Sequence, residues 1–223
     1  GSLESALLPW LAGVPRRAGV RNGRSLLLDR GFREPPQRRE KFKEPRRLPR
    51  YMGDLYADLA ALAGIRVADS RPRLAVTAAE EEQCAGLRRR LGLGEEPYFL
   101  LNPGAAYGAA KLWPPESMAR TGSLLHRSRG WRGVVLSGPD PAEQELARRV
   151  AEAGEGVAAA VGEELVRLGP LKPLVRDAAF MLSTDSGPRH FAVALGPPHV
   201  ALLGPTDPRF TGRHLERARV VRR

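Results

Sequence analysis

The stretch "AAFMLSTDSGPRHFAVALGPPHVALLG", residues 178–204, predicts a strand, a helix and a second strand in succession. Its apolar runs at 178–184 and 199–204 have the length of buried strands, and the segment between them opens with Pro188, a residue that the first turn of a helix tolerates. A strand–helix–strand unit sets its two strands in parallel, because the helix carries the chain back along the sheet. The stretch therefore predicts a parallel sheet covered by helices.

The same alternation extends over the second half of the chain, from residue 97 onward. The further elements that the pattern predicts are a strand at 98–102, a helix at 115–127, a strand at 133–138, a helix at 141–153, a strand at 157–161 and a helix at 171–177. Continuous apolar strands alternating with helices indicate an α/β fold with a parallel sheet buried on both faces. Ligands of such sheets bind at the carboxyl ends of the strands.

The first half of the chain has a different texture. Its predicted elements are helices at 3–12, 51–63 and 77–91 and a short strand at 25–28. Thr77 with Glu80 three residues later predicts a capping box at the start of the third helix. Residues 33–50 carry too much proline and charge for a regular element. We place the domain boundary between residues 94 and 95.

The composition favours a protein that binds polyanions. The 223-residue chain has 36 Lys and Arg against 25 Asp and Glu, and its net charge is +11. Such a charge attracts nucleic acid, acidic membrane surfaces or nucleotides. Cys84 is the single cysteine, so neither an intramolecular disulfide nor a cysteine-based metal cage is expected. No apolar run approaches the roughly 20 residues of a membrane-spanning helix.

The turn "DSGPRH", residues 185–190, follows the first strand of the opening stretch. Gly187 permits unusual backbone angles and the close approach of a ligand, and Pro188 suits the start of a helix. The amide groups of that first turn form a ready anion site. Arg189 and His190 oppose the helix dipole there, a conflict that an anion bound between them would resolve. The alternative is an ordinary tight turn in which an acidic or hydroxyl side chain caps the helix.

The segment "PGAAYGAAKLWPPE", residues 103–116, follows another predicted strand. Gly104 and Gly108, with small residues beside them, leave backbone amides uncovered, and Lys111 follows. A loop of small residues with a lysine after a strand can cradle a phosphate. The Walker A pattern is absent, and the alternative is a flexible loop with a surface lysine. Two such turns at neighbouring strand ends are more telling together than either is alone.

These segments resemble those of the ADP-heptose:lipopolysaccharide heptosyltransferases of glycosyltransferase family 9. The resemblance rests on "NPGAAYGAAKLWP", "VVLSGPDPAE" and "LSTDSGPRHFAVALGPPHVALLGPTDP". Because "SLESALLPWLAGVPRRAGVRNGRSLLLDR" near the N-terminus also looks like a segment of this family, the resemblance covers nearly the whole chain. It implies a GT-B fold of two Rossmann-like domains, with residues 1–94 in an incomplete acceptor domain and 95–223 forming the ADP-sugar domain. It also implies inverting transfer of heptose to the lipopolysaccharide inner core. No DxD motif is present in the chain, so no metal cofactor is expected.

The resemblance assigns roles by position. Lys111 would stabilise the leaving diphosphate, and Asp185 and His190 would hold the diphosphate and the sugar. Asp140 weakly matches an acidic residue that handles the ribose, and Thr206 would lie near the cleft. The other implied substrate contacts are Gly104, Ala105, Ala106, Tyr107, Ser186 and Gly187.

The chain departs from the family pattern at both ends. Family members are longer, and they begin with a strand and a glycine-rich loop carrying the aspartate thought to act as general base on the acceptor hydroxyl. The 223 residues do not contain that segment, and they end with "RHLERARVVRR", before the usual C-terminal helix. We therefore expect a chain truncated at both ends, with a donor half-site, without the base and with little transfer activity of its own.

Other functions stay open at this point. One is another GT-B enzyme, such as a sugar-nucleotide epimerase or a UDP-sugar transferase, and another is a family descendant that catalyses nothing. A nucleic-acid-binding protein fits the charge, but the chain has no known reading motif and no aromatic platform, so no nucleic-acid partner is expected. The implied partners are ADP-heptose and a lipopolysaccharide core precursor. The positive charge then favours a cytoplasmic protein peripheral to the inner membrane.

Overall fold

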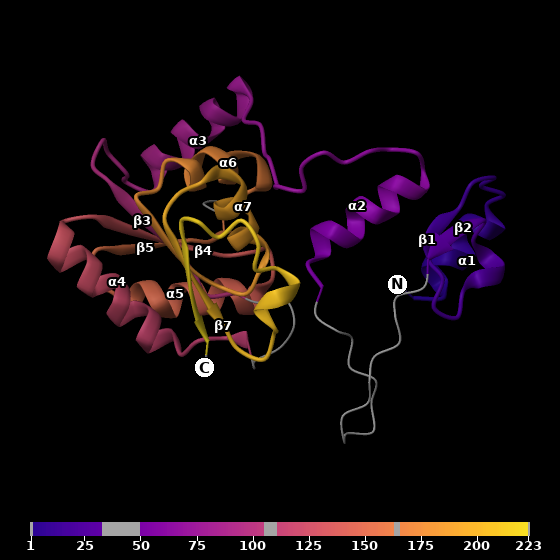
Figure 1. The fold of residues 1–223 in the computed structure, drawn as a ribbon. Helices are drawn as coiled ribbons and strands as arrows, with labels where there is room; N and C mark the ends of the chain where they lie inside the picture. Colours follow the sequence, from indigo (N-terminus) through magenta and orange to yellow (C-terminus); the bar gives the residue numbers. More distant parts are fainter. Residues whose placement is uncertain (1, 33–49, 105–110, 163–165, 223) are drawn as a thin grey trace, which may run out of the picture. The chain divides into compact units, whose positions relative to one another are not determined.

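The computed structural model describes residues 2–32, 50–104, 111–162 and 166–222 (Figure 1). The chain divides into two compact units. The first comprises Gly1–Arg71 with Asp207–Arg213, and the second comprises Pro72–Thr206 with His214–Arg223.

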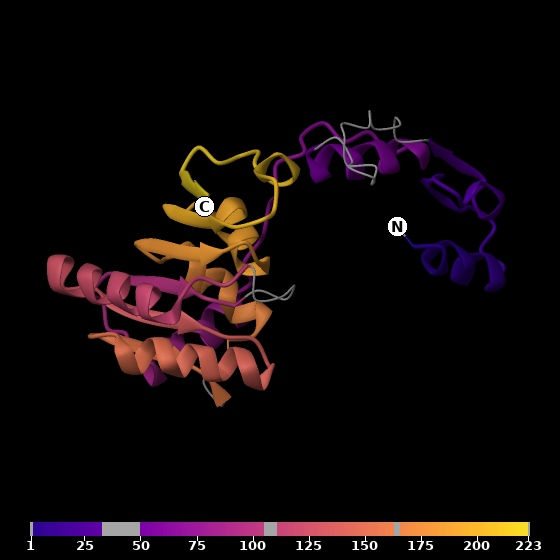
Figure 2. The ribbon, with the colours of Figure 1, turned by 90° about the horizontal axis from the view of Figure 1, so that it is seen from below.

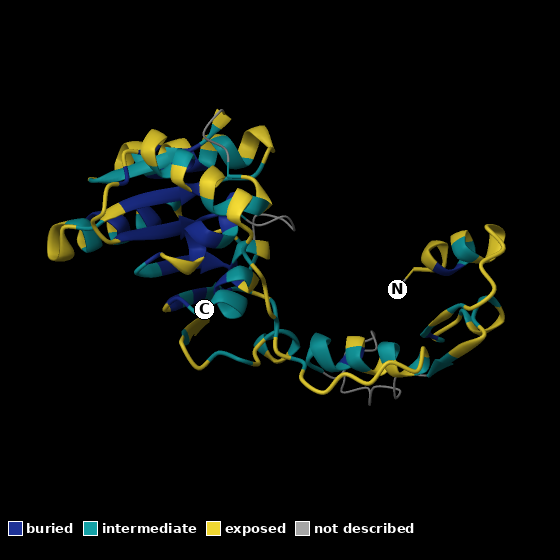
Figure 3. Cartoon of the chain, turned by 90° about the horizontal axis from the view of Figure 1, so that it is seen from above, coloured by how far each residue is buried: buried dark blue, intermediate teal, exposed yellow. Residues whose placement is uncertain are grey.

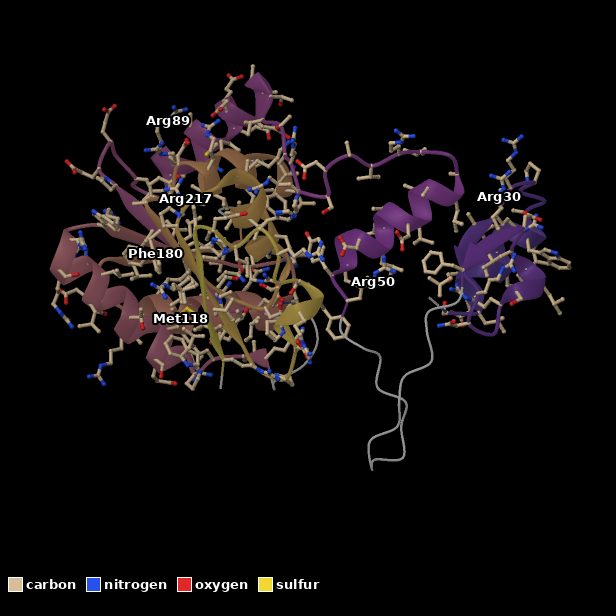
Figure 4. The ribbon with its side chains drawn as sticks, in the orientation of Figure 1. Arg30, Arg50, Arg89, Met118, Phe180 and Arg217 are labelled. Carbon is tan, nitrogen blue, oxygen red and sulfur yellow. The ribbon has the colours of Figure 1, made fainter. Side chains whose placement is uncertain are left out.

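The first unit is small. Its helices and strands are α1 (Glu4–Leu11), β1 (Ala18–Val20), β2 (Arg30–Phe32) and α2 (Met52–Leu62). β1 and β2 pair in parallel, and α2 packs on both strands. Arg30 Nη1 donates to Leu62 O at 3.1 Å, a contact that ties β2 to the end of α2 (Figure 4). The described part of this unit thus holds a two-stranded parallel sheet, less than a Rossmann-like domain contains.

The predicted strand at 25–28 is wrong. Ser25–Leu27 forms a turn of 3₁₀-helix, and the strands lie on either side of it. Because β1 and β2 run in the same direction, the chain between them must cross back, and the apolar run sits in that crossover. Gly23, with φ 76°, begins the turn.

The second unit is built on a parallel sheet of six strands within the described residues, in the order β5-β4-β3-β6-β7-β8. The strands are β3 (Tyr98–Asn102), β4 (Arg132–Leu136), β5 (Val157–Ala160), β6 (Phe180–Thr184), β7 (His199–Leu203) and β8 (Ala218–Arg222). From β3 the chain winds outward in one direction through β4 and β5, then returns to β6 on the other side. This is the strand order of a Rossmann fold, with its switch point between β3 and β6.

Helices cover both faces of this sheet (Figures 1 and 2). The helices of the unit are α3 (Ala78–Arg90), α4 (Pro115–Arg129), α5 (Pro141–Ala153), α6 (Leu168–Arg176) and α7 (Gly187–Leu195). Leu100 packs with α3, α6 and α7, whereas its neighbours Phe99 and Leu101 pack with α4 and α5. Met118 and Phe180, which are labelled in Figure 4, pack with Phe99 and Leu101 on the face that α4 and α5 cover. Figure 3 shows the middle of the sheet as the buried layer, and β3 is buried over its whole length. The α/β prediction is confirmed.

Helix α3 begins as the sequence predicts. Thr77 Oγ1 accepts from Glu80 N at 3.4 Å, and Glu80 Oε2 accepts from Thr77 N at 2.9 Å, which completes the capping box. The helix belongs to the second unit, because its buried Leu87 packs in the sheet core and Glu81 pairs with Arg176 of α6 at 2.6 Å. The first unit therefore gives way to the second between residues 71 and 72 of the chain. The boundary expected from the sequence lies later, after α3, between residues 94 and 95.

Strand β8 has no counterpart among the sequence-based predictions. It pairs with β7 in parallel from Ala218 to Arg222 and forms an edge of the sheet. Its apolar content is the exposed pair Val220 and Val221, with arginines on both sides. So short an apolar signal is typical of an edge strand and too weak to predict one.

Candidate functional site

A cavity of about 500 Å³ opens in the second unit at the switch point of the sheet. Segments that follow three neighbouring strands supply its walls, because the carboxyl ends of parallel strands meet at one edge. The wall residues at or just after the ends of β3, β4 and β6 include Asn102, Gly104, Ser137, Gly138, Ser186 and Gly187. Apolar side chains at the start of α6, Val166, Leu168 and Leu171, line another part of it.

A polar network joins the ends of β3 and β6 at the wall of this cavity. Asn102, which pairs in register with Ser183, donates from Nδ2 to Ser183 Oγ at 3.2 Å and to Ser186 Oγ at 2.6 Å. Thr184 Oγ1 donates to Gly104 O at 2.5 Å. Asn102 and Thr184 are buried, so these bonds hold both strand ends in one arrangement.

The carboxylate that faces the cavity is that of Glu143, on the first turn of α5. Its Oε2 accepts from Gly138 N at 3.0 Å. A Cβ on Gly138 would lie 2.3 Å from the same oxygen, and one on Gly104 would lie 3.2 Å from Oε1. The two glycines therefore leave the room that this carboxylate occupies.

Asp140 has a different place from the one that the resemblance implies. Its Oδ1 accepts from Ala142 N at 2.7 Å and caps α5. The side chain is exposed and does not line the cavity. Glu143, three residues further on, is the acidic group at the wall. Asp140 directly before Pro141 is a local helix-capping pattern, but the sequence does not tell which of the two carboxylates faces the cavity.

Lys111, Asp185 and Arg189 form an ion cluster beside the cavity. Lys111 Nζ lies 3.0 Å from Asp185 Oδ2, and Arg189 Nη2 lies 3.2 Å from Asp185 Oδ1. Burial by itself would raise the pKa of Asp185, but hydrogen bonds from Lys111 and Thr206 and the nearby positive charges lower it below its ordinary value. Asp185 is therefore ionised at neutral pH.

The N-terminus of α7 forms the wall next to this cluster. Ser186 is the N-cap without a side-chain cap bond, since its Oγ accepts from Asn102. Gly187 does not have a positive φ, and a Cβ there would meet nothing within 4 Å. Its expected role as a residue of unusual backbone angles is therefore wrong, whereas the open space in front of it agrees with close approach of a ligand.

Arg189 and His190 point to different surroundings on α7. Arg189 is 1% exposed and forms an ion pair with Asp185. The Asp185 carboxylate therefore supplies to Arg189 the negative charge that the sequence led us to expect from a bound anion. The His190 side chain is exposed, yet its pKa is lowered by loss of solvent around the ring and by the charge of Arg189, against the opposing effect of Asp185. His190 is therefore neutral at pH 7.

The structure thus gathers most of the candidate residues at one edge of the sheet. Gly104, Ser186 and Gly187 line the cavity, and Lys111, Asp185 and Thr206 meet beside it. Ala105, Ala106 and Tyr107 lie outside the described residues. Sequence reasoning missed Asn102, Glu143, Arg167 and the pairing of Arg189, of which Asn102 could have been found as the polar end of an apolar strand.

The described ranges contain no group of three or more His, Cys, Asp or Glu placed to hold a metal ion. None of their helices has the length and apolar character needed to cross a bilayer.

Fold and site together define a Rossmann-like domain, with the cavity at the switch point where such sheets hold their ligands. The family model of glycosyltransferase family 9 (heptosyltransferase) matches residues 1–223, and the chain belongs to this family.

The most similar relatives include two curated proteins. Lipopolysaccharide heptosyltransferase 2 of Escherichia coli is 30% identical over 99% of this chain and 62% of its own length. Lipooligosaccharide heptosyltransferase 2 of Haemophilus influenzae is 27% identical over 99% of this chain and 63% of its own length. The chain therefore spans less than two thirds of the length of these relatives.

A solved structure gives the same answer for the fold. The structure of E. coli ADP-heptose lps heptosyltransferase II matches 99% of this chain and 65% of its own length, with a TM-score of 0.74 and 28% identity. The predicted GT-B type fold is confirmed by this likeness.

Proposed function

We propose that this chain supplies the donor site of a heptosyltransferase, which binds ADP-heptose and takes part in inverting transfer of heptose to the lipopolysaccharide inner core. The observation that carries the proposal is the cavity at the switch point, with the Glu143 carboxylate on one wall and the start of α7 on another. Family membership supports the choice of reaction.

Each part of an ADP group has a matching surface. The adenine fits the apolar wall of Val166, Leu168 and Leu171, and the Glu143 carboxylate accepts from ribose hydroxyls. The diphosphate lies at the free amides of the α7 N-terminus, where the helix dipole favours negative charge. Lys111 lies beside that position, and Asp185, Ser186, Gly187 and His190 surround it.

The chemistry follows from this placement. An acceptor hydroxyl attacks the anomeric carbon of the heptose while the bond from that carbon to the diphosphate oxygen breaks. Negative charge develops on the leaving ADP, and the Lys111 ammonium and the α7 amides stabilise it. The acceptor proton passes to a general base, a role that we assign to none of these side chains.

Calorimetric titration tests the donor site. We expect micromolar binding of ADP at pH 7.5 and at least tenfold weaker binding of UDP, because the apolar wall suits a purine. His190→Ala should weaken ADP binding, whereas Arg148→Ala, an exposed change on α5, should not. Equal binding of ADP and UDP would favour another GT-B enzyme. A folded chain that binds DNA but no ADP would contradict the proposal.

The proposal extends to metal and membrane. ADP affinity should change less than threefold between EDTA and 5 mM Mg²⁺, because Lys111 and the α7 amides supply the positive charge. The acceptor is membrane-seated and phosphorylated, and the net charge of +11 supports peripheral binding at the cytoplasmic face. Co-sedimentation with vesicles of phosphatidylglycerol, weakened by 0.5 M salt and absent with phosphatidylcholine vesicles, checks this.

A further inference from the structure

Arg189 is the largest fully buried side chain of the described residues, with 1% of its surface exposed. It lies in the first turn of α7, where the helix dipole disfavours a cation. Removing a guanidinium from water costs several kcal/mol unless the charge is compensated. Both the helix dipole and the loss of hydration therefore disfavour this cation, and a negatively charged partner is needed to offset them.

The partner shared with the rest of the site is Asp185. Arg189 Nη2 lies 3.2 Å from Asp185 Oδ1, and Lys111 Nζ lies 3.0 Å from Asp185 Oδ2, so each carboxylate oxygen has its own cation. Thr206 also donates to this carboxylate. The three charged groups sum to +1, whereas Lys111 and Asp185 by themselves would sum to zero.

The exposed fraction of the side chain rises from Arg189 through Asp185 to Lys111. The side chain of Arg189 is 1% exposed, that of Asp185 is 8% exposed and that of Lys111 is 19% exposed. The buried cation is therefore on the inner side, and the cation nearest to solvent is Lys111. Burial lowers the pKa of His190 and of His199, and the charge of Arg189 contributes to the same direction at both rings.

We propose that Arg189 is a positioning residue that compensates the charge of Asp185 and thereby leaves the Lys111 ammonium available to the phosphates of a nucleoside diphosphate. Arg189 itself does not touch the ligand. The inference rests on the proposed function, since it concerns the same donor site. It explains why a cation is buried at a helix start: Asp185 can orient Lys111 without cancelling its charge.

The test measures how much the phosphates add to binding. The readout is the ratio of the dissociation constants of adenosine and ADP, obtained by calorimetry at pH 7.5 for the wild-type chain, Arg189→Met and Arg189→Lys. The ratio should fall at least tenfold in Arg189→Met, where the cluster sums to zero, and stay within threefold in Arg189→Lys. A purely structural role would weaken adenosine and ADP alike. An unchanged ratio in Arg189→Met overturns the inference.

Arg189→Gln is the second variant, because it removes the charge and keeps hydrogen-bond donors at the same place. Its ratio should also fall at least tenfold, and an unchanged ratio overturns the inference. If Arg189→Met does not fold, Arg189→Gln decides by the same criterion. A folded wild-type chain that binds no ADP would refute the proposed function, whereas failure of the ratio test alone refutes only the role of Arg189.

Discussion

Lys111 Nζ lies 3.0 Å from Asp185 Oδ2, although the two residues are 74 positions apart in the chain. The contact arises because β3 and β6 are neighbours in the sheet, so the segments after them leave it at the same edge. It brings together the two turns that the sequence singles out for phosphate binding. Substitutions of Lys111 and Asp185 therefore test the proposed phosphate-binding role of both turns.

Lys111→Met should lower ADP affinity roughly 10- to 100-fold, which corresponds to the roughly 1.5–3 kcal/mol that a hydrogen bond to a charged group contributes. Adenosine affinity should stay within threefold, because the proposed function assigns the Lys111 ammonium to the phosphates. Calorimetric titration of both ligands measures this. Lys172→Met, which removes a lysine paired with Glu80 in the same unit, is the matched control. Equal losses for adenosine and ADP would contradict a phosphate role.

Glu143→Gln should weaken ADP at least fivefold and remove the preference for ADP over 2′-deoxy-ADP, because the amide accepts ribose hydroxyls less strongly than the carboxylate. Competition titration with the two nucleotides measures the preference. Asp140→Ala is the matched control. It should keep the preference and lower the free energy of unfolding by about 1 kcal/mol, since it removes a helix cap. The reverse pattern would return the ribose role to Asp140.

Asp185 should make stability depend on pH in a defined direction. Its pKa is lower in the folded chain than its ordinary value, so the carboxylate stabilises the fold above its unfolded pKa, and this stability is lost as pH falls through the folded pKa. Asp185→Asn should cost roughly 3–5 kcal/mol at pH 7, because it leaves Arg189 buried without this carboxylate. The difference from wild type should shrink below about pH 4.

Urea denaturation of the wild-type chain and Asp185→Asn at pH 7, 5 and 3 measures this difference. Asp177→Asn, whose carboxylate pairs with Arg176 at the surface, is the control and should change stability by less than about 1 kcal/mol. A cost for Asp185→Asn that is the same at all three pH values would show that the carboxylate is not the titrating group.

Cys84 should be unreactive in the folded chain. It is 3% exposed in the core between α3 and the sheet, and burial raises the pKa of its thiol to about 11. Since the thiolate is the reactive form, a disulfide reagent such as dithionitrobenzoate should label it at pH 8 at least 100-fold more slowly in buffer than in 6 M urea. Fast labelling in buffer would show that α3 does not pack as described.

Local patterns predicted much of this fold. The apolar runs of β3 and β6, the proline at the start of α7 and the Thr77–Glu80 capping box each depend on residues close together in the chain. All residues that form such a pattern lie within a single strand or helix, and the structure contains the strands and helices that these patterns predict. Helix α6 begins at Leu168, three residues before its predicted start, because no capping side chain marks its N-terminus.

The sequence by itself determined the succession of strands and helices, and with it the edge of the sheet at which a site forms, because both follow from the period of apolar residues and from turn residues. The tertiary structure decided which carboxylate faces the cavity, Glu143 and not Asp140, and that Arg189 is buried against Asp185. Local spacing sets Asp185 and Arg189 four residues apart, but the burial of this pair and the direction of the Glu143 side chain depend on how the helices pack against the sheet.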